Sequence, residues 1–576
     1  MTESYTFSIV LFSLAAVMCL ITLTYVIRRA FSREAGEICG WELRGARSRI
    51  GAVARTTLAE GIRSKFVSGF ALIILVALPL FWLTAEGDGT IKGKVQMFIN
   101  YSMGFAGFIL SLATIFFSCM SLSNEILSRQ IYAIASKPIP RWQLLAGKWV
   151  GIMSFNVMVV LIVSVATYFG VQGTMGRFRT HLAHELETYC GLTEDQAQDA
   201  VAALDDVKGI GKKGAESPVV SVMAETLGRT DEQITELLLY LPEATRMDLR
   251  RFDELRRQVL VARASVMPEI PDLREDAAAW YEKLKEEDRL PTDRTDREIR
   301  EQLETELLAL YSTIPPACGK TWGLDGPPPQ AGSDFIMSVR FKFHVPAQLP
   351  AGIFLGKTLE KDALLCRWLA GDDRTTSFFA KVDTFPVDAF NEFEIPVQCV
   401  DQSGKILLSF ENLDPRRGAA VFGTPDALEV LYRVGSFRLS VFQAALAMLV
   451  PITCLTSLGV CASTFLSYSV GSLILVTTFI LSISMGFVAE SFAATSEYAP
   501  PNPGLYFEVR RATIDMVAWS LYMGDVEPVR QLIEGRAVGW SRLWENCWKQ
   551  VILKSGAVMF VGVLVLRRRE LAAIIV

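Results

Sequence analysis

Charge is missing from one long stretch of the chain. Between Arg438 and Glu490 there are 51 residues without a charged side chain. An α-helix needs ~20 apolar residues to cross the hydrocarbon core of a bilayer. The stretch is therefore long enough for two spans joined by a tight turn, and it predicts a membrane protein rather than a soluble one.

Residues for metal binding and catalysis are also scarce. The chain has only three histidines, His181, His184 and His344, and its ten cysteines form no CxxC pair. A Cys/His metal site is therefore not expected, and His344 is expected in solvent because it falls on the polar side of an alternating stretch. No motif surrounds a candidate nucleophile, so we expect no catalytic residue, no cofactor and no enzyme activity. The net charge of −5 gives no sign of a nucleic-acid partner.

A phosphate-binding loop is missing as well. No GxxxxGKS or GxxxxGKT sequence occurs; Gly319-Lys320-Thr321 comes nearest, but Ile314 stands where the first glycine is required. ATP-driven work would therefore need a partner chain that binds the ATP. Carboxylates are absent from the apolar segments, whereas a proton-coupled transporter usually has an ionisable group there. Only Lys554 comes close, and it is expected to extend to the headgroups.

Six apolar segments predict about seven membrane-spanning helices. The first segment lacks a basic start and a small-residue cleavage site, so an uncleaved anchor is preferred over a signal peptide. The segments are residues 7–27, 66–85, 97–120, 149–171, 439–489 (a pair of spans) and 550–566.

Basic residues predict the orientation, because Lys and Arg are enriched in cytoplasmic loops. Residues 28–65 contain nine Lys or Arg against four Asp or Glu, and residues 121–148 contain four against one. Arg567-Arg568-Arg569 follows the last span. With seven spans these three segments all face the cytoplasm, whereas the insert 172–438 and residues 490–548 lie outside.

The first part of the insert has a helical pattern. Apolar residues recur at helical spacing in 247–263, and again in 293–312, where Leu303, Leu307 and Leu308 share one side. Residues 180–312 are therefore expected to form helices. Two prolines at 315 and 316 and three at 327–329 predict a linker from Pro315 to Gly332.

The second part of the insert, residues 334–434, alternates apolar and polar residues. Such a period of two predicts a small antiparallel β-sandwich. Asp401-Gln402-Ser403-Gly404 is expected to turn a hairpin between strands near 393–399 and 406–410. Cys366 and Cys399 share this region and are the better candidates for a disulfide, although Cys399 also fits the apolar face as a plain core residue.

Two amphipathic segments flank the second and third spans. Ile50, Ala54, Leu58 and Ile62 form one stripe, which predicts a helix lying flat on the membrane before the chain enters it. The loop 121–151 is expected to form two short helices broken by Lys-Pro-Ile-Pro at 137–140. Such an amphipathic element can lie in the headgroups or dock into another protein, and the residues alone leave both open.

The order of these elements resembles the permease subunit of type-2 ABC transporters. As in that family, an interfacial helix is followed by two spans and by a helix containing Glu125. The sequence KPIPRWQLLAGK (137–148) and a further span come next. The resemblance covers residues ~49–171 and ~439–571, including the basic tail after the last span. In that family the loop forms a coupling helix, which implies an ATPase-subunit interface at Glu125, Arg129, Pro138, Arg141, Gly147 and Lys148.

The resemblance implies a multi-pass permease of the cytoplasmic (inner) membrane, moving an unidentified substrate in the direction of export. Its implied partners are a cytoplasmic ABC ATPase subunit, which binds the ATP, and a second permease copy or paralogue. The alternative is a membrane-anchored receptor or interaction protein that presents a sensory extracytoplasmic domain. Co-purification of an ATPase, or an ATP-binding-cassette gene beside this one, separates the two.

The chain departs from the simplest pattern of the family by an additional N-terminal span and by the long insert. The predicted domains are residues 1–48 (anchor and cytoplasmic linker), 49–171 (interfacial helix, two spans, coupling loop and third span), 172–332 (helical extracytoplasmic region), 333–438 (β-rich extracytoplasmic region) and 439–576 (last three spans, with extracytoplasmic helices in 490–548).

Overall fold

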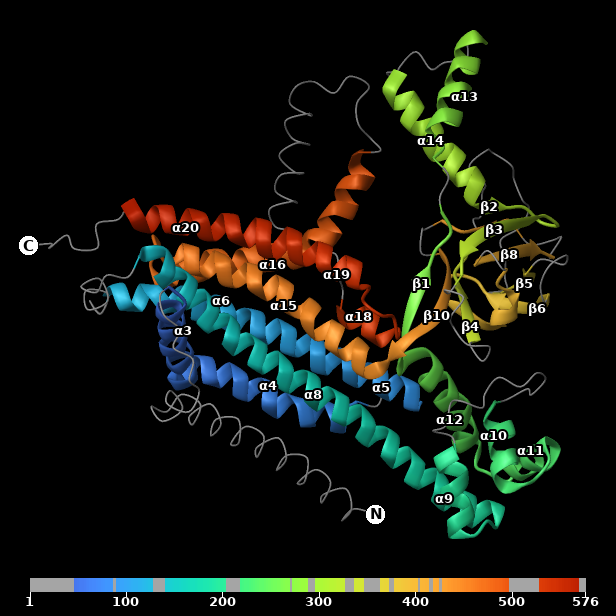
Figure 1. Ribbon diagram of the computed structural model, residues 1–576. Coiled ribbons are helices and arrows are strands. Elements are labelled where there is room, and N and C mark those ends of the chain that lie inside the picture. The colour runs from blue at the N-terminus through green and yellow to red at the C-terminus, as the bar shows by residue number, and fades with distance from the viewer. Residues whose placement is uncertain are drawn as a thin grey trace, which may run out of the picture.

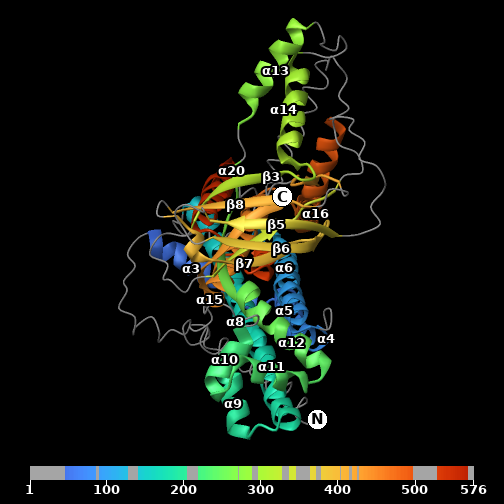
Figure 2. The ribbon, with the colours of Figure 1, turned by 90° about the vertical axis from the view of Figure 1, so that its right-hand side faces the viewer.

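The computed structural model combines a bundle of long helices with a mixed body of strands and short helices at one end (Figures 1 and 2). We call this end of the bundle the sheet end and the opposite end the loop end. The structure describes residues 46–85, 90–127, 140–203, 218–269, 272–287, 296–326, 336–345, 363–371, 378–401, 404–413, 418–423, 427–496 and 528–568.

Five helical segments in the described part of the chain are long and apolar enough to cross a membrane. Each contains one of the predicted spans, and α16 (Tyr468–Ser496) follows α15 as the expected second helix of the charge-free pair. The predicted span 7–27 lies outside the described residues. The five are α4 (Lys65–Thr84), α5 to α6 (Ile91–Ile99 and Phe105–Leu127, joined by the π-helix Asn100–Gly104), α8 (Arg141–Cys190), α15 (Phe437–Ala462) and α19 to α20 (Trp540–Asn546 and Gly556–Arg568, joined by the π-helix Cys547–Ser555).

Four elements meet at the loop end: α3 (Ala46–Arg63), the last turn of α6, the first turn of α8 and the last turn of α20 (Figure 1). α3 crosses the ends of the bundle helices, with Ala54 and Leu58 of its apolar stripe buried. The predicted amphipathic helix is therefore confirmed. The described parts of the three basic sequence segments, residues 46–65, 121–127 with 140–148, and 567–568, lie at this end.

α8 extends well beyond the bundle at the sheet end. Its 50 residues correspond to ~75 Å at 1.5 Å per residue, whereas a hydrocarbon core is ~30 Å thick. The predicted span 149–171 and the start of the predicted helical region are thus one helix. It ends at Cys190 and is capped by Gly191, whose φ of 64° is the left-handed conformation that commonly terminates a helix. The short helices that follow are α9 (Glu194–Ala203), α10 (Pro218–Leu227), α11 (Asp231–Leu239) and α12 (Glu243–Glu254).

The β-rich region is a sandwich of two four-stranded antiparallel sheets, ordered β1-β10-β4-β7 and β3-β8-β5-β6, with a separate β2-β9 pair. Phe341 of one sheet and Trp368 of the other meet in its core, their ring centroids 4.6 Å apart. The predicted sandwich is therefore confirmed. Its strands are β1 (Val261–Val266), β2 (Thr313–Ile314), β3 (Gly319–Asp325), β4 (Ile336–Phe341), β5 (Ala363–Ala370), β6 (Phe379–Pro386), β7 (Asn391–Pro396), β8 (Lys405–Asn412), β9 (Ala420–Val421) and β10 (Leu428–Ser436).

The predicted hairpin around residues 401–404 is confirmed only at its turn, where the Gly404 N–H donates to the Asp401 carbonyl oxygen at 2.9 Å and Val400 forms an antiparallel bridge with Ile406. Its two long strands do not pair with each other. β7 pairs with β4 in one sheet, whereas β8 pairs with β3 and β5 in the other. A 3-10 turn at Val397–Cys399 lies between β7 and the turn, and the chain then crosses from one sheet to the other. Each strand still buries one face, because the two sheets face each other across a shared core. The alternating pattern is therefore the same for a hairpin as for this crossing.

The sandwich also begins earlier than predicted. The expected helix 247–263 ends as α12 and the π-helix Leu255–Val259, after which β1 pairs with β10. β3 lies inside the expected linker and pairs with β8. Both strands are held by partners at least 80 residues away in sequence, and a local pattern cannot contain that information.

Between β1 and β2 the chain forms a helical arm that projects from the sandwich (Figures 1 and 2). The arm consists of α13 (Arg274–Glu286) and α14 (Asp296–Ser312) and has its own small core, which includes Tyr281 and Leu303. α14 confirms the helix expected at 293–312. Leu308 does not belong to the arm's core with Leu303 and Leu307; it is exposed.

The sandwich is joined to the bundle without a flexible linker. β10 ends at Ser436, and α15 begins at the next residue, Phe437. α18 (Pro528–Ile533), one of the short helices expected before the last span, packs against both α15 and α5. Just after α18, Gly535 and Ala537 exchange backbone hydrogen bonds with Arg263 of the edge strand β1, so the sheet end is a joint between three parts of the chain.

Candidate functional site

At the loop end, an ion pair joins the two helices on either side of residues 128–139. Lys148 of α8 lies with its Nζ 2.8 Å from Oε1 of Glu125 on α6. The same ammonium donates to the carbonyl oxygen of Ser121 at 2.8 Å and to its hydroxyl at 3.1 Å. Lys148 is only 1% exposed, so all its hydrogen-bonding capacity is used within the chain.

Helix α3 covers this ion pair and adds a second carboxylate. Burial raises the pKa of Glu60. The positive charge of Lys148 acts against this increase, and the negative charge of Glu125 adds to it. α3 approaches α8 closely because glycines line the contact. A Cβ on Gly147 would lie 2.6 Å from the Cβ of Val53, and one on Gly151 would lie 2.7 Å from the carbonyl oxygen of Ala54. Glycine is thus a steric requirement at both positions.

Arg141 fixes the end of the last helix. Its Nη1 donates to the carbonyl oxygens of Leu566 and Arg567 in the final turn of α20, the latter at 2.8 Å. The last carbonyls of a helix have no partner within the helix, and a cation there also complements the helix dipole. Arg141 therefore connects the start of α8 to the end of α20.

The residues expected at an ATPase-subunit interface thus fall into two groups. Gly147 and Lys148 are buried, Glu125 pairs with Lys148, and Arg141 contacts α20, so these four organise the base of the loop. Lys148 and Gly147 are buried within the chain, and their place at an interface stays a prediction. Arg129 and Pro138 lie outside the described residues. The expected two short helices are, where described, the end of α6 and the start of α8.

At the sheet end, a buried carboxylate is the centre of a second charged network. Glu429 of β10 is fully buried; the Ser265 hydroxyl and the Arg536 guanidinium donate to it, and Arg340 lies 3.6 Å away. Burial raises the pKa of Glu429, against the hydrogen bond of Ser265 and the charges of both arginines. No local sequence pattern predicted this site, because its residues come from three separate strands and from the segment just after α18.

Glu534 connects the same network to the bundle. Its carboxylate lies 3.0 Å from Arg340, 3.1 Å from Arg536 and 3.4 Å from Arg530. Burial opposes its ionisation, but the hydrogen bond and charge of Arg340, with the charges of the other two arginines, lower the pKa of Glu534. The pKa values of Glu429 and Glu534 are therefore shifted in opposite directions, although Arg340 and Arg536 lower both, because burial outweighs the arginines at the more deeply buried Glu429.

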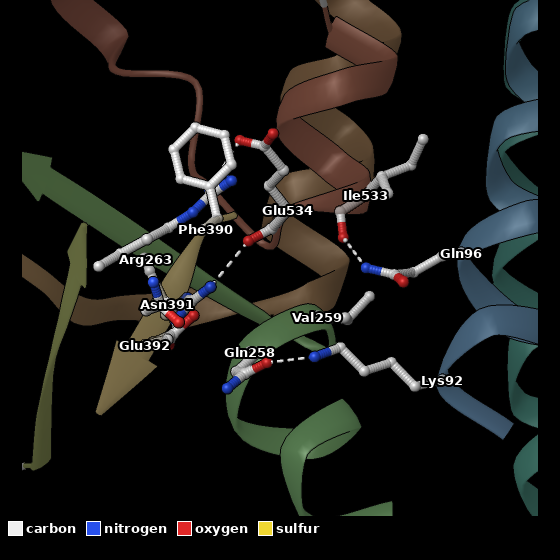
Figure 3. A pocket seen from close by; sticks show the side chains of 11 residues that line it. Lys92, Gln96, Gln258, Val259, Arg263, Phe390, Asn391, Glu392, Ile533 and Glu534 are labelled. Atoms are coloured by element: carbon white, nitrogen blue, oxygen red, sulfur yellow. Dashed lines mark hydrogen bonds and ion pairs between the residues drawn. The ribbon is translucent and has the colours of Figure 1, made fainter. Parts of the chain in front are cut away.

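Beside this network lies a cavity of about 370 Å³, bounded by α5, the π-helix before β1, strands β4 and β7, and the end of α18 (Figure 3). Gln96 of α5 donates to the carbonyl oxygen of Ile533 at 3.2 Å, and Lys92 donates to Gln258. The helix bundle and the sandwich thus contact each other through polar side chains. The charged residues of the lining are Lys92, Arg263, Arg340, Glu392 and Glu534.

Several expectations about chemistry can be compared with the structure. Gly319-Lys320-Thr321 lies in strand β3, paired along its length with β8, so it is not a phosphate-binding loop. Cys366 and Cys399 are free thiols in the sandwich core, which corrects the proposed disulfide. His344 is exposed, as expected. Within the described ranges, no three His, Cys, Asp or Glu side chains are grouped to hold a metal ion.

Comparisons with protein-family models, with curated proteins and with solved structures give no match. Any functional conclusion therefore has to rest on the residues and their geometry.

Proposed function

We propose that the chain is the permease subunit of an ATP-driven ABC transporter in the cytoplasmic membrane. It would act together with a separate cytoplasmic ATPase subunit and a second permease, and move a substrate in the direction of export. The ATPase would bind and hydrolyse the ATP, and this chain would convert its motion into a rearrangement of the helices. The large extracytoplasmic insert would move with the helices to which it is joined.

The observation that carries this proposal is the ion pair between Glu125 and Lys148. A loop that transmits force between two subunits needs a stiff base, since a flexible base would absorb the motion. Residues 128–139 connect α6 to α8 in the sequence, and the ion pair joins these same two helices. α3 packs on α8 at Gly147, and Arg141 holds the end of α20, so movement of the loop would act on four elements together.

The continuity of the sheet end supports the same interpretation. α8 extends from the base of the loop into the helical part of the insert, and α15 continues directly from β10. Two of the apolar helices therefore connect rigidly to the insert. Displacement at the loop end would reach the insert through continuous helices without an intervening hinge loop.

The test is recovery of the ATPase with the permease. The permease is co-expressed with an ATP-binding-cassette protein of the same source, chosen from the neighbouring genes where one is encoded there, and purified through a tag on the permease. We expect the ATPase to co-purify and its ATP hydrolysis to rise in the complex. Arg129→Glu, a charge reversal in the loop itself, should reduce recovery about tenfold or more, since losing one partner of a buried interfacial pair costs ~2–5 kcal/mol.

Lys94→Glu is the matched control. Lys94 is exposed on α5, far from the loop, so its charge reversal should leave recovery unchanged. Membrane insertion and elution volume are compared for all three proteins. If no ATPase is recovered with the wild type, the transporter proposal fails, and the alternative of a receptor with a sensory ectodomain is favoured. If Arg129→Glu and Lys94→Glu both leave recovery unchanged, the loop is not the docking element.

A further inference from the structure

The cavity at the sheet end has the size of a small-molecule site. Pockets for small molecules usually occupy ~300–1,000 Å³, and this one is about 370 Å³. Its walls come from the helix bundle, the sandwich and the segment before the last apolar helix (Figure 3). A molecule bound there would contact all three parts, including Lys92 on α5 and Glu534 after α18.

Arg263 is a donor held in a fixed position in this wall. It is 4% exposed; its Nη1 donates to Glu392 and its Nη2 donates to the carbonyl oxygen of Glu534 at 2.8 Å. Its Nε is buried and has no hydrogen-bond acceptor among the described residues. A buried N–H without an acceptor is costly, and the usual remedies are an ordered water or a ligand oxygen.

A second guanidinium is held at the same wall. Arg340 lies over the ring of Phe390, with its Cζ 4.2 Å from the ring centroid, and its Nη1 is directed to Glu534. Planar guanidinium groups in fixed positions match the oxygens of carboxylate and phosphate groups. The remaining lining includes the carboxamides of Gln96, Gln258 and Asn391, which suit hydroxyl groups.

We propose that this cavity binds a small organic anion, with its carboxylate or phosphate group against Arg263 and Arg340 and towards Lys92, and its hydroxyl groups against the carboxamides. Binding would clamp α5, the sandwich and α18 together. The proposal concerns the chain alone and does not require the ATPase or transport. An anionic group of this kind belongs either to a free solute or to a lipid headgroup at the membrane surface.

The test uses the full-length protein in a neutral detergent, without any ATPase. Binding of radiolabelled glycerol 3-phosphate is measured by equilibrium dialysis, and thermal unfolding is followed with glycerol 3-phosphate, gluconate or the short-chain lipid dihexanoyl phosphatidylglycerol. Glucose serves as the neutral probe, and sodium chloride is matched for ionic strength. We expect saturable binding and an increase in melting temperature with the anions but not with glucose or sodium chloride.

Substitutions locate the site. Lys92→Gln removes one charge from the lining and should weaken binding about tenfold, the usual size of a lost charge-assisted hydrogen bond. Arg263→Lys keeps the charge beside Glu392 but removes the Nε donor, and it should weaken binding as well. Lys94→Gln is the matched control on the same helix, since Lys94 is exposed and does not line the cavity. Elution volume and the unliganded melting temperature confirm folding.

The outcomes are distinct. Tighter binding of glycerol 3-phosphate or gluconate than of the short-chain lipid supports a free solute, and the reverse order supports a headgroup. The proposal is overturned if no anion binds saturably beyond the sodium chloride control, in which case the cavity holds water. It is overturned equally if Lys92→Gln and Arg263→Lys bind as the wild type does, or if Lys94→Gln weakens binding as much as Lys92→Gln.

Discussion

Lys148 and Glu125 form an ion pair across two helices, with the lysine almost completely buried and its Nζ 2.8 Å from the carboxylate. The pair closes the base of the loop between α6 and α8. Removing one partner of a buried pair leaves the other charge uncompensated, which costs far more than an exposed pair contributes. This relationship makes the loop end sensitive to conservative substitutions.

We expect Lys148→Met to lower the free energy of unfolding by ~3–5 kcal/mol, because the carboxylate of Glu125 is then left partly buried without its cation. The measurement is the thermal unfolding midpoint of the detergent-solubilised protein. Lys94→Met, at an exposed position on α5, is the control and should change little. The double variant Glu125→Gln with Lys148→Met should be less destabilised than the sum of its parts. Additive effects would show that the pair does not interact.

Gly147→Ala should separate α3 from α8. The new Cβ would lie 2.6 Å from the Cβ of Val53 and 3.0 Å from the carbonyl oxygen of Ile50, so the two helices have to shift. Overpacking of this kind costs ~1–3 kcal/mol, again visible in the unfolding midpoint. Gly69→Ala on α4 is the control, because nothing lies within 4 Å of its Cβ position. It should be neutral or slightly stabilising, and an equal loss in both variants would contradict the close contact.

The charged network at the sheet end should make the free energy of unfolding depend on pH. The pKa of Glu534 is lowered in the folded protein, so its charged form contributes stability above its unfolded value of 4.5, and this contribution is lost as the pH falls through the folded value. Glu534→Gln should therefore be less stable near neutral pH and lose less stability below about pH 4.5.

The pKa of Glu429 is raised in the folded protein, so its protonation at falling pH favours the folded state. This gain partly offsets the stability lost at Glu534. Unfolding midpoints between about pH 3.5 and 7 test the prediction for Glu534, with Glu236→Gln at an exposed position of α11 as the control. Parallel pH profiles for the wild type and Glu534→Gln would show that Glu534 is not responsible.

Labelling of the cysteines in the insert tests both the side of the membrane on which the insert lies and the burial of its thiols. Cys318 is exposed, whereas burial raises the pKa of Cys366 to about 12 and that of Cys399 to about 11, which suppresses their reactive thiolates. In intact cells with a permeable outer envelope, a membrane-impermeant maleimide should label Cys318 if the insert lies outside. Cys366 and Cys399 should react only after denaturation. Labelling of Cys318 only after the membrane is opened would reverse the predicted orientation, and Cys318→Ser identifies the labelled site.

The apolar helices could be predicted from the sequence because their signal is local. A run without charge, such as 439–489, needs no knowledge of its neighbours to be assigned as α15 and α16. The amphipathic stripe of α3 and the alternation in 334–434 are local as well, and both gave the right type of element. The pairing of strands was not predictable in this way, since the same alternation fits a hairpin and a crossing between two sheets.

By itself, the sequence determined which segments are apolar helices, where a β-rich region lies and which loop carries both charge and amphipathic character. Only the tertiary structure decided what the charged residues do. It buried Lys148 against Glu125. It also brought Glu429, near the end of the insert, and Glu534, in the segment that precedes the last apolar helix, to the same arginines. Such contacts join residues far apart in the chain, and their energy comes from removing charges from water together, which no local pattern records.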